Sequence, residues 1–178
     1  MSDAHLPGAG EPAAAQPDAL LEAVTLLIPV LLRGVEGLGR AGRHLEPTLL
    51  EALAAEVDAL GAPLAAALAT FEAQDWPVGL EDFRRCVAES ASRALTGIER
   101  FAMAPTREQA LMAAYRALGQ HWRALEALYP VAAMLPPVSR FFLNDRARGD
   151  AALGARLAEC AGTPDRGVMH ADNAPDQR

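Results

Sequence analysis

The sequence contains no lysine, so all 16 of its basic residues are arginines. Arginine in place of lysine throughout is typical of a GC-rich coding sequence. The arginines are outnumbered by 23 acidic residues, and the formal net charge at pH 7 is −7. An acidic chain with dispersed arginines is repelled by nucleic-acid phosphates and by anionic membrane surfaces. The charge therefore argues against nucleic-acid binding and against electrostatic docking to a membrane.

Aromatic residues are also scarce, at 5% of the chain, whereas 51% of the residues are hydrophobic and 22% are charged. Alanine and leucine carry much of the hydrophobic count, and they are the best helix formers. The β-branched and aromatic residues that suit sheets are few. A length of 178 residues is enough for one domain with a real core. The composition therefore predicts one globular, all-α domain.

Signals for secretion, membrane insertion or structural disulfides are missing. Cys86 and Cys160 lie far apart and lack the spacing of a zinc site or a CxxC redox pair. The N-terminal stretch has no basic segment followed by an apolar core, so it does not read as a signal peptide. The strongest apolar run, residues 20–32, has about 13 residues and includes Glu22. Because a spanning helix needs about 20 apolar residues, we expect a cytoplasmic protein without a transmembrane segment.

Motifs for catalysis or metal binding are missing too. None of the four serines lies on a glycine-flanked GxSxG turn, which presents the nucleophile in many hydrolases. No Glu-x-x-His pair, the mark of a di-metal helical bundle, occurs. His44 lies in an expected loop, and His121 near the end of an expected helix, where a surface or capping role is the more common one. We therefore predict no catalytic residue, no cofactor and no metal site in this chain.

Apolar residues three and four positions apart predict the first two helices. The first runs from Asp18 to about Arg40, with Pro29 expected to kink it and four nearby glycines expected to end it. The second begins at Glu46, with Pro47 suited to its first turn, and runs to about residue 71. Within it, Pro63 beside a glycine is expected to cause a bend.

Two further long helices are predicted. One covers residues 80–101 and carries a narrow alanine face that would let a neighbour approach closely. The other is opened by a capping box, Thr106 to Gln109, and continues to about residue 129. Its apolar face is expected to pack in the core, including an aromatic row that also resembles a recognition strip. That face contains Leu111, Tyr115, Leu118, Trp122, Leu125 and Tyr129. Together the four segments predict a kinked antiparallel helical bundle.

The C-terminal part is expected to contribute one or two short helices. Pro136-Pro137 should end any preceding helix, and a weaker helix is expected over residues 150–160. Four large apolar residues cluster just after the two prolines: Val138, Phe141, Phe142 and Leu143. The expected organisation is a flexible N-terminal arm (1–17), a helical bundle domain (18–161) and a polar C-terminal tail or connector (162–178), with both termini disordered.

Two stretches carry a resemblance to a known family. The runs YPVAAMLPPVSRFFL (129–143) and GVMHADNAPDQR (167–178) resemble the region just upstream of the catalytic core in bacterial phospholipase- and carboxylesterase-like α/β-hydrolases. In that family a helical N-terminal segment precedes a serine-hydrolase core that holds all the catalytic residues. The resemblance implies that this chain is a non-catalytic accessory module, serving as a lid, a docking surface or a folding partner, and that its tail is a connector to such a core.

Two hypotheses about partners follow. Under the first, the apolar cluster Val138, Phe141, Phe142 and Leu143 contacts the hydrolase core or another protein, since exposed apolar patches tend to mark interfaces. Under the second, the chain is a free-standing helical protein that binds a hydrophobic small molecule or forms a homo-oligomer through its alanine-rich helix faces. A cavity for such a ligand would be held open by the kinks at Pro29 and Pro63.

Overall fold

A computed structural model of the chain describes residues 17–43, 47–103 and 107–162. These residues are almost entirely helical, and no strand occurs among them. In chain order the elements are α1 (Pro17–Arg43), α2 (Pro47–Asp58), α3 (Gly61–Glu72), the 3-10 helix η1 (Val78–Leu80), α4 (Glu81–Ala102), α5 (Arg107–Leu128), the 3-10 helix η2 (Tyr129–Met134) and α6 (Pro136–Gly162). The all-α class expected from the sequence is confirmed. Residues 1–16 of the expected arm, the start of the capping box at Thr106 and the tail from residue 163 lie outside the described residues, whereas Pro17 is the first residue of α1.

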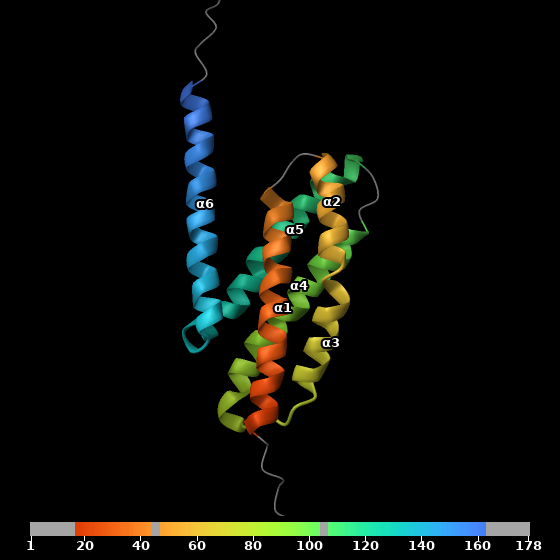
Figure 1. Ribbon diagram of the computed structural model, residues 1–178, viewed down its shortest axis with the longest axis vertical. Helices are drawn as coiled ribbons and strands as arrows, with labels where there is room; N and C mark the ends of the chain where they lie inside the picture. The colour runs from red at the N-terminus through yellow and green to blue at the C-terminus, as the bar shows by residue number, and fades with distance from the viewer. Residues whose placement is uncertain (1–16, 44–46, 104–106, 163–178) are drawn as a thin grey trace, which may run out of the picture. The chain divides into compact units, whose positions relative to one another are not determined.

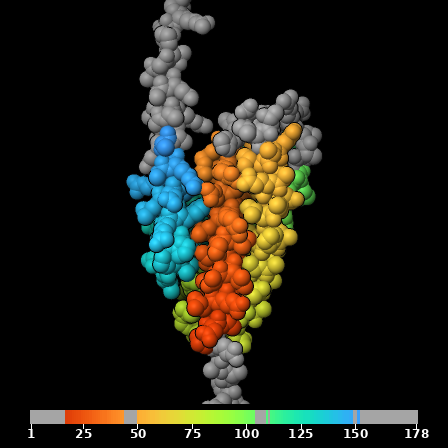
Figure 2. Space-filling view, in the orientation of Figure 1, coloured from red at the N-terminus to blue at the C-terminus, as the bar shows by residue number. Residues whose placement is uncertain are grey.

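The chain forms two compact units, Met1–Arg140 and Phe141–Arg178. In the first unit, α1, the α2–α3 pair, α4 and α5 follow one another up and down, which gives the predicted antiparallel bundle (Figure 1). The α4–α5 pair packs behind α1 and α3, and α1 contacts every other long helix of this unit. Figure 2 shows α1 lying alongside α2 and α3 on one face of the unit.

Glycines in the second half of α1 allow its close packing. A Cβ atom on Gly42 would lie 2.4 Å from the Cβ of Leu118, and one on Gly39 would lie 2.8 Å from the ring of His121. The helix continues to Arg43, three residues beyond the expected end, because tertiary contacts offset the low helix propensity of glycine. Pro29 lies inside α1 on an exposed position, so its missing hydrogen-bond donor faces solvent.

The expected second helix is divided into α2 and α3 by a turn at residues 59–60. Pro63 is the third residue of α3, a position whose main-chain nitrogen has no partner inside the helix in any case. The proline therefore starts a new helix, and the predicted bend becomes a break. Pro63 is exposed, as is Pro29, so neither proline lines an internal cavity.

Within the described part of the chain, length and composition alone would allow one helical run, Leu50–Glu72, to cross a membrane, although no transmembrane segment was expected. In the structure this run is the broken α2–α3 pair, and its large side chains pack against α1 and α4. The buried ones are Leu50, Leu53, Val57, Leu64, Leu68 and Phe71. The run also contains Glu51, Glu56 and Asp58, which are exposed in the bundle and which a bilayer would disfavour.

Small side chains bring α4 and α5 together. Ala91 and Ala94 are fully buried in α4, as the predicted alanine face requires. A Cβ atom on Gly97 would lie 2.9 Å from the Cβ of Gln120 in α5, so this glycine also permits the close approach. In the turn between α3 and η1, the Trp76 ring contacts the Phe71 ring in a tilted arrangement, with 4.5 Å between the ring centroids, and its indole nitrogen donates a hydrogen bond of 3.0 Å to the Phe71 carbonyl.

The prediction that the large apolar face of α5 packs in the core is largely wrong. Tyr115 is 72% exposed, Trp122 57% and Leu111 54%, and Tyr129 in η2 is exposed as well. Half of the buried residues described in α5 are instead alanines, and the larger buried ones are Gln120, His121, Leu125 and Leu128. The alanines are Ala113, Ala114, Ala117 and Ala124. The physical reason is that the glycines of α1 and the alanines of α4 leave little room between the helices, so the narrow side of α5 packs inward.

Beyond η2, the two prolines follow the end of the preceding helical segment, as expected, but they also open one 27-residue helix in place of the one or two short helices predicted. Pro136 and Pro137 occupy its first turn, where main-chain donors are not needed. Leu135 is extended, and its carbonyl accepts hydrogen bonds of 2.9 Å and 3.0 Å from the next turn of the chain. The boundary between the two units falls inside α6, after Arg140, so the helical domain expected over residues 18–161 is divided there.

Candidate functional site: a charged cleft and an aromatic helix face

His121 is fully buried in the bundle, contrary to the expected surface or capping role. Its Nδ1 lies 2.8 Å from the main-chain carbonyl oxygen of Val35 in α1. Because a carbonyl oxygen can only accept, Nδ1 carries a hydrogen and donates it. The ring lies against Gly39, where no side chain stands in its way. His121 therefore joins α5 to α1. In the sequence, the glycines in the second half of α1, Gly39 among them, were the available sign that a large side chain from another helix packs there.

Ser90, which is buried, also links two helices. The hydroxyl of Ser90 in α4 donates a hydrogen bond of 2.9 Å to the carbonyl of Ala124 in α5. Ser139, at the start of α6, donates in the same way to the Ala132 carbonyl, at 2.6 Å. Both hydroxyl hydrogens are thus directed at main-chain oxygens and not at a base. Neither serine has the geometry of an activated nucleophile.

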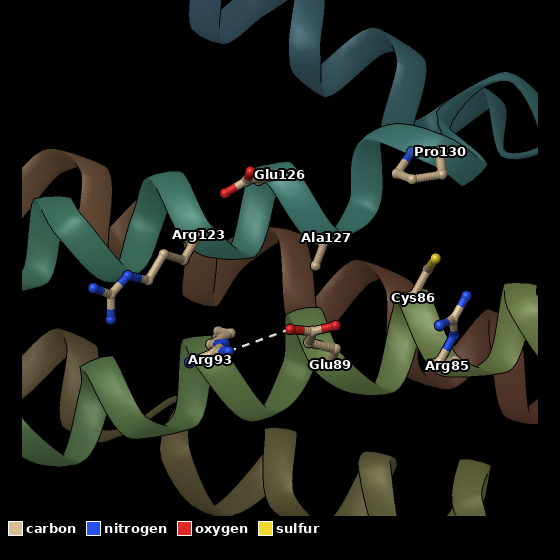
Figure 3. A pocket seen from close by; sticks show the side chains of 8 residues that line it. All are labelled: Arg85, Cys86, Glu89, Arg93, Arg123, Glu126, Ala127 and Pro130. Carbon is tan, nitrogen blue, oxygen red and sulfur yellow. Dashed lines mark hydrogen bonds and ion pairs between the residues drawn. The ribbon is translucent and has the colours of Figure 1, made fainter.

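A cleft of about 500 Å³ lies between α4 and α5 on the surface of the first unit (Figure 3). Charged side chains line most of it, with a half-buried free thiol and a proline near one end. Its lining consists of Arg85, Cys86, Glu89, Arg93, Arg123, Glu126, Ala127 and Pro130. Pockets for apolar small molecules are lined mainly by hydrophobic side chains. This cleft therefore offers no support for the hypothesis of a hydrophobic ligand.

Ion pairs within α4 engage two of the three cleft arginines. Arg93 pairs with Glu89 at 3.3 Å, as the dashed line in Figure 3 marks, and Arg85 pairs with Asp82 at 2.8 Å. Arg123 and Glu126, on the α5 side, form no ion pair within the part of the chain that the structure describes. The α5 side of the cleft thus presents charges of both signs, which are free to meet charges on another molecule.

Next to the cleft, the outward side of α5 forms an apolar surface that we call the α5 outer face, made of Leu111, Met112, Tyr115 and Trp122. At 100° per residue these four positions fall within about a third of the helix circumference. The ring of Trp122 contacts the ring of the buried His121 edge-on, with 5.2 Å between the ring centroids. The face lies on a regular helix and not on a loop.

The four residues predicted as an interface do not form one surface. Val138 is fully buried and belongs to the core of the first unit, so it is unavailable to a partner. Phe141, Phe142 and Leu143 belong to the second unit; the two phenylalanines are half-buried and Leu143 is 69% exposed. For these three residues the interface role stays a prediction. Sequence clustering could not separate Val138 from them, because burial is decided by the helix face.

Among residues 17–43, 47–103 and 107–162 no group of three histidine, cysteine or acidic side chains is placed to hold a metal ion. Comparison of the chain with protein-family models, with curated proteins and with solved structures found no match. Function must therefore be argued from the surfaces themselves and from the resemblance described above.

Proposed function

We propose that this chain is a non-catalytic helical accessory module of an esterase- or phospholipase-like serine hydrolase, and that it acts by contacting the hydrolase core. The resemblance of residues 129–143 and 167–178 to the region upstream of such cores carries the proposal. The described side chains agree with a binding role, since the buried polar groups Ser90 and His121 hold helices together through main-chain carbonyls.

The contact with the hydrolase is assigned to Phe141, Phe142 and Leu143 at the start of the second unit. These residues lie inside the resembling stretch, and Leu143 exposes a large apolar side chain. An exposed leucine in sequence next to two half-buried phenylalanines suits an apolar contact with another domain. As a lid, docking surface or folding partner, the module would leave bond cleavage to the hydrolase.

The test begins with the DNA that follows the codon for Arg178, where we expect a reading frame that encodes GxSxG. The encoded hydrolase is then produced with and without this chain, and hydrolysis of a nitrophenyl ester and binding between the two proteins are measured. Leu143→Asp should weaken binding at least tenfold. Asn144→Asp, which places the same charge on the neighbouring exposed position, should leave it unchanged.

The proposal fails if no hydrolase is encoded nearby, or if the encoded hydrolase neither binds the chain nor changes its activity or solubility in its presence. It also fails if the isolated chain hydrolyses the ester and a serine-directed reagent abolishes that activity. Equal effects of Leu143→Asp and Asn144→Asp would remove the assignment of the contact to the apolar cluster.

A further inference from the structure

Exposed arginines gather along the groove between α4 and α5, the two helices that form the charged cleft. The helices touch at Gly97 of α4, where a Cβ atom would lie 2.9 Å from the Cβ of Gln120 in α5. Positions three and four residues from such a contact are its neighbours on the helix surface. Four exposed arginines occupy these positions: Arg93 and Arg100 in α4, and Arg116 and Arg123 in α5.

The four arginines border one groove, which we call the arginine groove. Arg93 and Arg123 both line the cleft, and Figure 3 shows Arg123 directed from α5 toward α4. Seven residues are almost two full helical turns, or about 10 Å. Arg100 therefore continues the flank of α4 that carries Arg93, and in the antiparallel α5 the flank of Arg123 continues to Arg116. The groove thus holds two cross-helix pairs about 10 Å apart: Arg93 with Arg123, and Arg100 with Arg116.

Most of the positive charge in the arginine groove has no partner. Arg100, Arg116 and Arg123 form no ion pair within the described ranges, although acidic residues outnumber arginines in the chain by 23 to 16. Arg93 pairs with Glu89 at 3.3 Å, but both side chains are about half exposed, and such pairs are weak and readily exchanged. Like charges that face each other across two packed helices destabilise the bundle. An anion bound between them offsets this repulsion.

We propose that the arginine groove binds a small molecule that carries two or more phosphate groups. A guanidinium group presents a planar fork of N–H donors that matches the oxygens of a phosphate. Because the two arginine pairs are about 10 Å apart, a ligand with several phosphates engages both pairs, whereas a single phosphate engages one. The adjoining cleft of about 500 Å³ is within the size range of small-molecule sites and accommodates the rest of the ligand.

The charge of the whole chain favours a small ligand over a nucleic acid. Charges in solution are screened beyond about 8 Å at physiological ionic strength. A small ligand in the groove therefore meets the arginines and the two cleft carboxylates, Glu89 and Glu126, but little of the remaining surface. A duplex would extend over a chain whose net charge is −7 and would be repelled. The proposal concerns this chain alone and does not rest on the hydrolase.

Isothermal titration calorimetry of the full chain with inorganic triphosphate and with inorganic monophosphate tests the proposal. We expect saturable binding of triphosphate and at least tenfold weaker binding of monophosphate, which engages only one arginine pair. Arg116→Gln should weaken triphosphate binding about tenfold. Arg33→Gln is the matched control, since it removes the same charge from an exposed position of α1, and it should leave the affinity unchanged. Circular dichroism checks that both variants stay folded.

A variant that gains affinity completes the test. Glu89→Gln should tighten triphosphate binding severalfold, because it releases Arg93 and removes a negative charge from the cleft. A wild-type chain that does not bind triphosphate at millimolar concentration overturns the proposal. So does an equal affinity of Arg116→Gln and Arg33→Gln, or a Glu89→Gln variant that binds no more tightly than wild type. Duplex DNA that binds more tightly than triphosphate would assign the arginines to nucleic acid and would also overturn it.

Discussion

Replacing Gly42 by alanine should destabilise the bundle, although alanine is the better helix former. The new Cβ would lie 2.4 Å from the Cβ of Leu118 and 2.9 Å from its Cα, whereas carbon atoms pack best at about 3.5–4.0 Å. Leu118 cannot move these atoms without shifting α5. Overpacking of this kind costs about 1–3 kcal/mol. A shortfall of more than 1 Å against the Cβ of Leu118, together with a smaller one against its main-chain Cα, belongs in the upper part of that range.

The gain in helix propensity, about 1 kcal/mol, offsets part of this cost. We therefore expect Gly42→Ala to lower the free energy of unfolding by about 1–2 kcal/mol. Gly119→Ala is the matched control, since it is the same substitution at an open position and should raise the free energy of unfolding by roughly 0.5–1 kcal/mol. The two variants should thus move in opposite directions.

The measurement is urea unfolding followed by far-ultraviolet circular dichroism at low micromolar concentration. Unchanged slopes of the unfolding curves would show that the shift in midpoint reports stability. A Gly42→Ala variant as stable as wild type would refute the close packing of α1 on α5. A destabilised Gly119→Ala would show that the outward side of α5 is covered within the monomer.

Three further predictions concern single hydrogen bonds. Ser90→Ala removes a buried bond between α4 and α5 and should cost about 1 kcal/mol in urea unfolding, with no effect expected if the hydroxyl faces water. Long-range nitrogen–hydrogen correlation spectra should show a hydrogen on Nδ1 of His121; a bare Nδ1 would contradict the bond to Val35. Trp76→Phe keeps an aromatic ring but loses the bond to the Phe71 carbonyl, so thermal unfolding should indicate a loss of about 1 kcal/mol. An unshifted midpoint would mean that the ring contact alone holds this turn.

The helices of the bundle were predictable because their signals are local. Apolar spacing located α1, α4 and α5 to within a few residues, and Pro63 marked the place where the second helix breaks. A proline acts through its own missing donor and its own ring, so its effect needs no knowledge of distant residues. The single long α6 was missed because arginine and alanine sustain a helix where apolar periodicity fades.

The orientation of α5 was not predictable from its own spacing. The helix carries a large apolar stripe and a small one, and periodicity favours the stripe with the larger side chains. Which stripe faces inward depends on the partners, namely on Gly39 and Gly42 in α1 and on Ala91 in α4. Reading these small residues together with the alanines of α5 would have indicated close helix packing. Gly119 matches no such partner, and no atom lies within 4 Å of the position its Cβ would take.

The packing of the second half of α1 also affects when this helix becomes fully structured while the chain is being synthesised. Its carbonyl at Val35 receives the His121 donor, 86 residues later. At about 5–20 residues per second, a ribosome takes roughly 4–17 seconds to supply that partner. Until then the glycine-bearing segment has weak helix propensity and can pack only on α2, α3 and α4, without its α5 neighbour. Although α1 is the first helix of the bundle to be made, its packing is thus complete only after α5 has been made.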